Sequence, residues 1–487
     1  MNQDTTLTPR LDTELFIGGE WIATEQRLTI LNPATGAPIA AVADADAVHG
    51  VAAAEAAAAA QDAWGRSAPR GRSDLLLRVQ RTMLDREHEL AALIVAETGR
   101  PVAEARAEVR YAADFLRWFS EEAVRVGGEY RIAPDGNSRI LTSHRPVGPC
   151  LLVTPWNFPA AMVTRKLGPA FAAGCTAVVK PAEQTPLTAL WLAQAFDDAG
   201  LPPGVLSVLP TSRPAQLAEA VLEHPAIRKL SFTGSTAVGR HLQQQAAQRL
   251  LRTSMELGGN APFLVLEDAD LDAALDGAII AKMRNGGQAC VAANRFYVHE
   301  RHATAFATEF ARRVDALRAG PLDDPSTEVG ALIDDRAIVK LEGAVAGALA
   351  EGAALVTGGV RPRSPGSWFP GTVLTDVDPS AEILRTELFG PVAPIVSFSD
   401  EETLQRMANS TSAGLAAYVY TRDADRALDW IDRLEVGMVA VNRGMVSNPA
   451  APFGGIKESG MGREGGREGI LEFLDVRYAA MTNATAT

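Results

Sequence analysis

From about residue 147 onward, short runs of apolar and β-branched residues alternate with longer segments of helical periodicity. The strand-like runs cover residues 150–154, 177–180, 206–209 and 229–232, and residues 186–199 form one of the helical segments between them. This alternation is typical of βα units that feed a parallel sheet. We therefore expect a doubly wound α/β sheet in this part of the chain.

A second series of apolar runs follows and predicts a second α/β domain. Its strands are expected at residues 263–266, 295–298, 392–397, 416–420 and 438–442. The N-terminal third differs, with an extended start at 15–21 and helices expected at 46–64, 71–98 and 102–123. A polar, β-leaning segment at 130–144 carries an Asp-Gly turn signal, and residues 469–481 read as helix and then strand. These two segments are candidates for β-pairing between subunits.

The composition excludes several kinds of partner. The chain has 487 residues, 46 Lys and Arg against 59 Asp and Glu, and no basic cluster, so neither nucleic acid nor an anionic membrane is expected to bind. No apolar run approaches the roughly 20 residues that cross a bilayer, and residues 1–10 are polar, which favours a cytoplasmic protein. We expect small molecules or other copies of the chain as partners.

The three cysteines, Cys150, Cys175 and Cys290, show no CxxC spacing, so neither a disulfide framework nor a metal site is expected. Cys150 and Cys175 lie in apolar patterns that are typical of buried structural cysteines. Cys290 differs because it ends the segment NGGQAC, in which paired glycines allow the backbone to approach a ligand closely before a potential nucleophile.

Two further segments carry groups that suit catalysis. Glu256 leads into a Gly-Gly turn at the junction of the two α/β series, where a carboxylate can activate water or a thiol. Asn157 lies in TPWNFP, directly after the first apolar strand, and its amide can donate to a developing oxyanion. A solvated loop residue and a structural turn are the plain alternatives at these two positions.

Two other segments suit a dinucleotide only weakly. Lys180 and Glu183 in KPAE follow a strand, where they can hold a ribose or simply form a surface ion pair. The segment FTGSTAVG, residues 232–239, combines a strand, a glycine turn and a helix start, which presents N–H groups to a phosphate. It matches neither a P-loop nor the GxGxxG pattern.

Taken in order, these motifs resemble the aldehyde dehydrogenase superfamily, together with ELFGP at 387–391 and PFGGIKESGMGRE at 452–464. The resemblance implies a cysteine thiohemiacetal and thioester mechanism with Cys290 as nucleophile, Glu256 as base and Asn157 as oxyanion donor. It implies NAD, preferred over NADP, as cofactor. The cofactor contacts that it implies are Thr154, Pro155, Trp156, Lys180, Glu183, Gly234, Ser235, Leu257, Glu387 and Phe389.

The finer resemblance is to the succinate-semialdehyde dehydrogenase branch, in which Arg165, Arg284 and Ser447 correspond to elements that bind the substrate carboxylate. Guanidinium groups suit such a carboxylate because they bind it bidentately. The position two residues after the nucleophile, a second cysteine in many members, is Ala292 here, so no disulfide switch is expected in the active site.

The resemblance also implies an aldehyde dehydrogenase-like α/β fold and a homodimer or homotetramer. A Rossmann-type cofactor domain is expected at 1–126 and 147–255, a second α/β catalytic domain at 256–445, and a small β oligomerisation arm at 127–146 and 469–487. Residues 446–468 are expected to return to the cofactor domain. Glutarate semialdehyde, 2-oxoglutarate semialdehyde or an uncharged aldehyde stay open as substrates. An acylating enzyme that transfers its thioester to coenzyme A and a non-catalytic protein on the same fold are the alternatives of other kinds.

Overall fold

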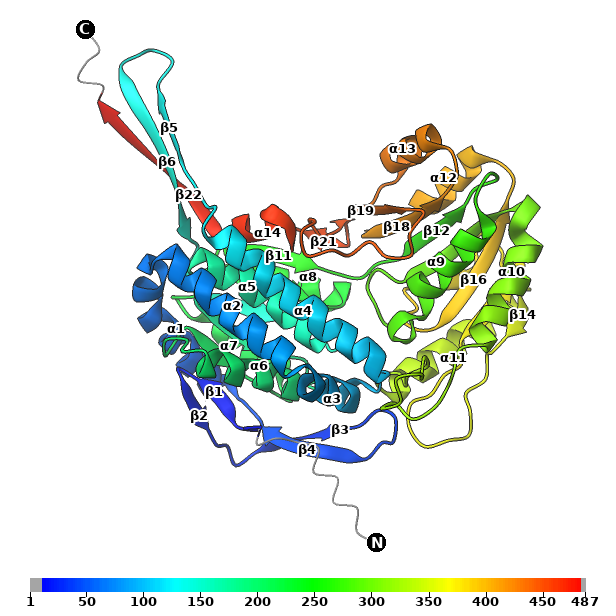
Figure 1. The fold of residues 1–487 in the computed structure, drawn as a ribbon, viewed down its shortest axis with the longest axis horizontal. Coiled ribbons are helices and arrows are strands. Elements are labelled where there is room, and N and C mark those ends of the chain that lie inside the picture. Colours follow the sequence, from blue (N-terminus) through cyan, green and yellow to red (C-terminus); the bar gives the residue numbers. More distant parts are fainter. Residues whose placement is uncertain (1–10, 483–487) are drawn as a thin grey trace.

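The computed structural model describes residues 11–482. Figure 1 shows two α/β units beside each other and a narrow β arm that projects from one end of the molecule. The polar segment 1–10 and the last part of the expected arm, 483–487, lie outside the described residues. Among the residues described, no helix combines the length and the apolar character that spanning a membrane requires.

The first unit is built on an eight-stranded sheet of order β2-β1-β9-β8-β7-β10-β11-β21. Strands β9, β8, β7, β10 and β11 are parallel, and β1, β2 and β21 add antiparallel edges. The strands are β1 (Leu15–Ile17), β2 (Glu20–Ile22), β7 (Cys150–Val153), β8 (Ala177–Lys180), β9 (Leu206–Val208), β10 (Lys229–Thr233), β11 (Arg252–Glu256) and β21 (Gly460–Met461). Strands β7 to β10 are buried throughout, as helix-covered parallel strands must be. The expected doubly wound sheet is confirmed.

Eight helices belong to this unit: α1 (Ala47–Arg66), α2 (Pro69–Asp85), α3 (Glu87–Thr98), α4 (Val102–Ala123), α5 (Pro159–Ala173), α6 (Pro186–Asp198), α7 (Pro214–Glu223) and α8 (Thr236–Ala247). Every residue of α5 is buried, because α4 packs along it and the sheet lies on its other side. The expectation of one helix over 71–98 is wrong. Arg86 leaves helical geometry (φ −109°, ψ 29°) and separates α2 from α3, although neither proline nor glycine marks the break.

The second unit contains a seven-stranded sheet of order β14-β15-β16-β13-β12-β18-β19. Its strands are β12 (Ala261–Val265), β13 (Ala293–His299), β14 (Ala354–Thr357), β15 (Thr372–Thr375), β16 (Val392–Phe398), β18 (Ala416–Tyr420) and β19 (Met438–Val441). Its helices are α9 (Leu271–Met283), η1 (Arg284–Gly287), α10 (Glu300–Asp315), α11 (Asp335–Ala350), η2 (Glu382–Leu384), α12 (Glu401–Asn409) and α13 (Ala424–Arg433). Phe263 stacks on Tyr420 at 4.9 Å between ring centroids in its core. The expected second α/β unit is therefore present.

The projecting arm is a three-stranded antiparallel sheet of β5 (Glu129–Ile132), β6 (Ser138–Pro146) and β22 (Leu474–Thr482), with β6 in the centre (Figure 1). The two segments that the sequence marked thus pair with each other within one chain. Helix α14 (Gly466–Leu471) precedes β22 and packs on α4 and α5.

Two small sheets complete the fold, one of β3 (Arg27–Leu31) with β4 (Pro38–Ala43) and one of β17 (Ala413–Gly414) with β20 (Ile456–Lys457). After β19 the chain returns to the first unit, where β21 pairs with β11.

Candidate active site

The candidate site lies at the carboxyl ends of three neighbouring strands, β7, β10 and β11. Asn157 follows β7, Ser235 follows β10, and Glu256 is the last residue of β11. Cys290 reaches the same place from the second unit, on the loop between η1 and β13. The carboxyl edge of such a sheet is where ligands bind, because the strand ends and helix N-termini leave room and free N–H groups there.

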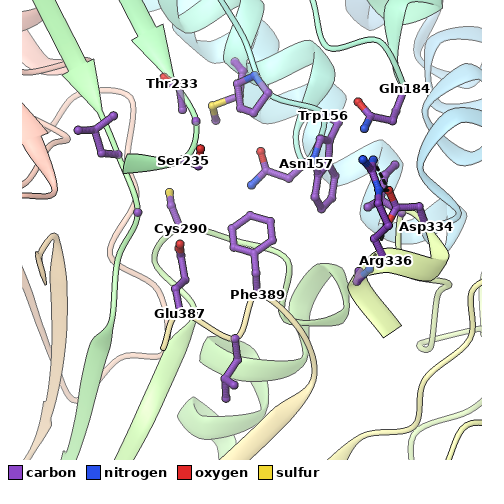
Figure 2. Close-up of a pocket in the computed structure, with 18 of the residues that line it drawn as sticks. Trp156, Asn157, Gln184, Thr233, Ser235, Cys290, Asp334, Arg336, Glu387 and Phe389 are labelled. Carbon is purple, nitrogen blue, oxygen red and sulfur yellow. Dashed lines mark hydrogen bonds and ion pairs between the residues drawn. The ribbon is translucent and has the colours of Figure 1, made fainter. Parts of the chain in front are cut away.

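A cavity of about 380 Å³ occupies this position. Figure 2 shows Cys290, Asn157 and Phe389 turned toward the same space. Of the residues that the sequence analysis named, ten line the cavity: Pro155, Trp156, Asn157, Gly234, Ser235, Glu256, Leu257, Cys290, Glu387 and Phe389. The structure therefore brings together three catalytic candidates and most of the cofactor candidates.

The glycine pairs beside Glu256 and Cys290 serve close contacts between main-chain segments. A Cβ on Gly259 would clash with the carbonyl oxygen of Cys290, and a Cβ on Gly287 would clash with the carbonyl of Gly390. Asn285, Gly286 and Gly287 also have positive φ values of 53°, 58° and 73°. The expectation that the NGG glycines admit a ligand is therefore corrected for Gly287, whose missing side chain makes room for the protein's own backbone.

Burial raises the pKa of the Cys290 thiol to about 12, although the positive charge of Arg165 acts in the opposite direction. Burial also raises the pKa of Glu256 well above its usual range, and the negative charge of Glu464 adds to the effect. Both carboxylate oxygens of Glu256 lack a hydrogen-bond partner among the described residues. A buried acceptor with no partner can take a proton from a thiol or from water.

Glu464 lies behind Glu256 and is itself paired. Its carboxylate contacts Lys166 at 2.5 Å and Arg165 at 3.5 Å. Burial alone would raise the pKa of Glu464, but these two cations hold it below its usual value. Two buried carboxylates therefore titrate far apart, which is a property of sites that transfer protons.

Asn157 is tied to the loop that carries Cys290. Its Nδ2 donates to the main-chain oxygen of Gln288 at 3.0 Å, and its Oδ1 has no partner among the described residues. A primary amide carries two N–H groups, so one remains for another acceptor. That second N–H suits an oxyanion formed at Cys290.

The polar cofactor candidates differ in their place and in their partners: Thr154, Lys180 and Glu183 lie outside the cavity lining, whereas Ser235 and Glu387 belong to it. Lys180 and Glu183 pair with each other at 3.5 Å, with Lys180 buried and Glu183 half-buried. Thr154 is buried at the end of β7 and does not line the cavity. Glu387 accepts the amide of Gly259 at 3.1 Å, and burial raises its pKa. Ser235 caps α8, since its hydroxyl accepts the amide of Val238.

The three substrate candidates lie outside this cavity. Arg165 is buried between the rings of Phe115 and Phe453, at 5.3 and 4.1 Å from their centroids. It donates to the hydroxyl of Tyr111 at 3.2 Å, and the same hydroxyl contacts Ser447. Two of the candidates thus share one phenol. Arg284 is half-buried over the ring of Phe158, and its charge, like that of Arg165, lowers the pKa of Cys290.

Sequence reasoning missed several residues of this region. Tyr111 lies on α4 in no motif, and Asp334, Arg336 and Lys340 line the cavity from α11 and its N-cap. Gln184, which directly follows KPAE, and Thr233, which lies inside FTGSTAVG, also line the cavity, and their motifs were a signal that could have found them. Within residues 11–482, no group of three or more His, Cys, Asp or Glu side chains is arranged to hold a metal ion.

A doubly wound sheet with a cavity at the carboxyl ends of its strands is characteristic of proteins that bind a dinucleotide, and Cys290 adds a nucleophile to the same cavity. The model of the aldehyde dehydrogenase family matches residues 21–479, and the chain belongs to this family. A nicotinamide dinucleotide is accordingly its cofactor. Among similar proteins, one is named for NADP(+) and others have solved structures with NAD or NADP bound.

Individual relatives are similar over nearly the full length. The succinate-semialdehyde dehydrogenase of Paenarthrobacter nicotinovorans is 51% identical over 91% of this chain and 99% of its own. A probable NADP(+)-dependent succinate-semialdehyde dehydrogenase of Sinorhizobium fredii is 46% identical over 93% and 92% of the two chains. The crystal structure of succinate-semialdehyde dehydrogenase from Burkholderia pseudomallei superposes with a TM-score of 0.95, at 45% identity over 98% and 99%.

Proposed function

We propose that this enzyme oxidises succinate semialdehyde to succinate through a covalent thioester on Cys290. The observation that carries the proposal is the convergence of Cys290, Glu256 and Asn157 on one cavity. The names of the similar relatives support the choice of substrate. So do the two arginines whose charges reach Cys290, because a cation suits the carboxylate that succinate semialdehyde carries at the end opposite its aldehyde.

In the proposed reaction, the Cys290 thiol loses its proton to Glu256 and its sulfur attacks the aldehyde carbon, which forms a thiohemiacetal. The N–H group of Asn157 and the main-chain amide of Cys290 stabilise the oxyanion. Loss of hydride from the same carbon leaves the thioester. Glu256 next releases the thiol proton to solvent and so becomes a base again. It then takes a proton from a water molecule whose oxygen attacks the thioester carbon, and the C–S bond breaks to release the acid and leave Cys290 as a thiolate.

The bound nicotinamide dinucleotide supplies the acceptor for the hydride. The cavity fits such a group, since Trp156 and Phe389 form an edge-to-face pair with ring centroids 5.4 Å apart on its wall. The buried hydroxyl of Thr233 and Oδ1 of Asn157 have no partners among the described residues and line the same cavity. In this proposal Glu387, Lys180 and Glu183 hold the riboses, and Ser235 meets the pyrophosphate.

Glu183 supports NAD as the preferred cofactor, because its carboxylate would bond the adenosine ribose hydroxyls and repel a 2′-phosphate. Lys180 acts in the opposite direction, but it is buried and paired with Glu183. Comparison of kcat/KM for NAD and NADP tests this part of the proposal. A clear preference for NADP would mean that Lys180 dominates the pocket.

We also propose that the first sheet and its helices bind the cofactor and that the arm joins subunits into a homodimer or homotetramer. Large apolar side chains are exposed on the arm, which supports a contact there: Tyr130, Ile132, Val476, Tyr478 and Met481. Light scattering on the purified protein would measure the oligomeric state.

The experiment that tests the function is a cofactor-reduction assay with succinate semialdehyde, glutarate semialdehyde and butyraldehyde, on wild type and Cys290→Ala. Succinate semialdehyde should exceed butyraldehyde by about tenfold or more in kcat/KM, since a charge-assisted bond contributes about 1.5–3 kcal/mol. Cys290→Ala should bind cofactor and turn over nothing. Turnover by that variant, or absence of any turnover by wild type, would refute the proposal. Acceleration by coenzyme A would indicate an acylating enzyme instead.

A further inference from the structure

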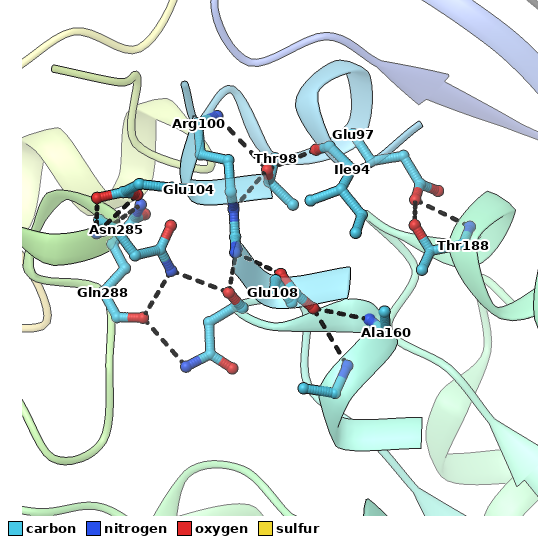
Figure 3. A network of polar contacts seen from close by, with 12 residues as sticks. Ile94, Glu97, Thr98, Arg100, Glu104, Glu108, Ala160, Thr188, Asn285 and Gln288 are labelled. Carbon is cyan, nitrogen blue, oxygen red and sulfur yellow. Dashed lines mark hydrogen bonds and ion pairs between the residues drawn. The ribbon is translucent and has the colours of Figure 1, made fainter. Parts of the chain in front are cut away.

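A cluster of buried polar side chains lies directly behind Asn157. It joins the end of α3, the helix α4, the loop after β7 and the loop that carries Cys290 (Figure 3). Its centre is Arg100, only 2% exposed, in the short segment between α3 and α4. Removing a guanidinium from water is costly, so each of its bonds in this place must be accounted for.

We propose that Arg100 is a positioning residue that holds Asn157 in the orientation in which its amide binds the oxyanion at Cys290. This inference rests on the proposed function, because it assumes that Asn157 is the oxyanion donor. Arg100 itself contacts neither the cavity nor Cys290. It acts through the backbone and the neighbours of Asn157.

All three nitrogens of the Arg100 guanidinium make polar contacts. Its Nε donates to the hydroxyl of Thr98 at 3.1 Å, its Nη1 pairs with Glu108, and its Nη2 donates to the main-chain oxygen of Asn157. The planar fork fixes these directions relative to one another. The carbonyl of Asn157 is therefore held against a rigid group that two other side chains anchor.

The loop of the nucleophile is attached to the same residue. Asn285 donates from Nδ2 to the main-chain oxygen of Asn157 at 2.9 Å and to that of Gln288 at 3.1 Å. The side chain of Asn157 donates to the same Gln288 oxygen. A carbonyl oxygen can only accept, so this contact fixes which end of the Asn157 amide is the NH₂ group.

Two carboxylates on α4 complete the cluster of buried polar side chains behind Asn157. Glu104 accepts the amide of Asn285 at 3.0 Å, where the backbone has a positive φ. Glu108 accepts the amides of Ala160 and Ala161 at 2.9 and 3.2 Å, in the first turn of α5. Because Arg100 also pairs with Glu108, the start of α5 and the carbonyl of Asn157 are held by one ion pair.

Replacement of Arg100 by lysine tests the role of the fork. Lysine keeps a positive charge for Glu108, but a point charge cannot also hold the carbonyl of Asn157 and the hydroxyl of Thr98 in these directions. We expect Arg100→Lys to lower kcat with succinate semialdehyde about 10- to 100-fold, since loss of a whole oxyanion donor costs about 100- to 1,000-fold. Cofactor binding should stay within about threefold, because Arg100 does not line the cavity.

The decisive measurement is a double-mutant cycle with Asn157→Ala. If Arg100 acts through Asn157, then Arg100→Lys should change kcat by less than about threefold when Asn157 is already alanine. The rate of Cys290 alkylation by iodoacetamide should also be nearly unchanged, since this displacement of iodide by sulfur builds no oxyanion. A residue that merely supports the fold would lower every one of these rates.

Arg72→Lys is the matched control. Arg72 is also a buried arginine, and its Nε donates to the carbonyl of Ala172 at 3.0 Å, near the opposite end of α5 from Asn157. This variant should keep kcat within about twofold. Thermal unfolding of all variants reports any general loss of stability. If Arg100→Lys fails to fold, Thr98→Val takes its place, because it removes the hydroxyl that orients Nε of Arg100. This variant should lower kcat about three- to tenfold, and its loss should be non-additive with that of Asn157→Ala in the same way.

Additive losses in the cycle, or an equal loss of alkylation and turnover, would overturn the positioning role. So would a loss in Arg72→Lys as large as that in Arg100→Lys. Failure of the proposed function has a different signature: wild type would not oxidise aldehydes, or Asn157→Ala would retain full activity, whatever Arg100→Lys does.

Discussion

The guanidinium of Arg165 donates to the hydroxyl of Tyr111 across 3.2 Å. The same hydroxyl contacts Ser447, so a residue of α4 joins two substrate candidates that are far apart in sequence. The phenol is half-buried, and Arg165 also contacts Glu464. The contact therefore connects the expected carboxylate site with the carboxylates near Cys290.

Tyr111→Phe should lower kcat/KM for succinate semialdehyde about tenfold, because the lost hydroxyl orients Arg165 and Ser447 and can itself donate to a carboxylate. The kcat/KM for butyraldehyde, which carries no carboxylate, should change little. The measurement is the ratio of the two kcat/KM values in wild type and variant. An equal loss for both aldehydes would show that Tyr111 has no role in recognising the carboxylate.

Arg284→Ala offers a cleaner test of charge recognition than removal of Arg165. Arg284 is half-buried and rests on Phe158, whereas Arg165 pairs with Glu464 in the interior. We expect Arg284→Ala to lower kcat/KM for succinate semialdehyde by about one to two orders of magnitude and to leave butyraldehyde almost unaffected. Arg165→Ala should lower both values, because it leaves a buried carboxylate with one cation fewer. If only Arg165→Ala lowered kcat/KM selectively for succinate semialdehyde, Arg165 would be the residue that binds the carboxylate and Arg284 would not.

Glu256→Gln should form the thioester and hydrolyse it slowly, since an amide cannot take a proton from water. Rapid mixing should show a burst of reduced cofactor close to the enzyme concentration, slower than in wild type because Glu256 also takes the thiol proton, followed by a steady rate about 100-fold or more below wild type. Asn157→Ala is the contrasting variant, because it keeps the base for hydrolysis, so no burst should precede its lowered steady rate. A wild-type steady rate in Glu256→Gln would exclude Glu256 as the base.

The pH dependence of Cys290 alkylation follows from burial, which raises the pKa of the thiol to about 12. Far below its pKa, the thiolate fraction rises about tenfold per pH unit, so the alkylation rate of the enzyme without cofactor should do the same between about pH 7 and pH 9. Cys290→Ala gives the background, because Cys150 and Cys175 are buried. A plateau near pH 8.5, where an ordinary thiol titrates, would contradict this expectation.

Lys282→Met should stabilise the protein near neutral pH. Lys282 is 1% exposed, its amine has no hydrogen-bond partner among residues 11–482, and burial lowers its pKa from 10.5 to about 7. Between these two values the unfolded chain holds a proton that the folded chain lacks, so wild-type stability rises with pH by up to about 1.4 kcal/mol per unit. The advantage of the variant should therefore shrink from about pH 7 to pH 10 in denaturant unfolding. A difference in the free energy of unfolding between variant and wild type that does not change with pH would refute this prediction.

The sequence determined most of the two sheets, because parallel strands buried on both faces must be apolar throughout. Residues 177–180 and 416–420 coincide with β8 and β18. The apolar pattern of the sequence did not reveal β11, because its residues, Arg252–Glu256, are largely polar. That strand is compatible with the sheet because Arg252 and Ser254 find partners in the C-terminal segment, the carbonyl of Leu474 and the carboxylate of Glu472.

The candidate site divides in the same way. Motifs in the chain identified Cys290, Glu256 and Asn157, because each lies beside glycines or prolines that mark its backbone geometry. Only the tertiary structure brought in Tyr111, Arg100, Glu108 and Arg336, which lie on or beside ordinary helices. A helix shows its periodicity in the sequence, but which of its polar residues faces a partner is decided by packing against segments hundreds of residues away, such as Ser447 opposite Tyr111.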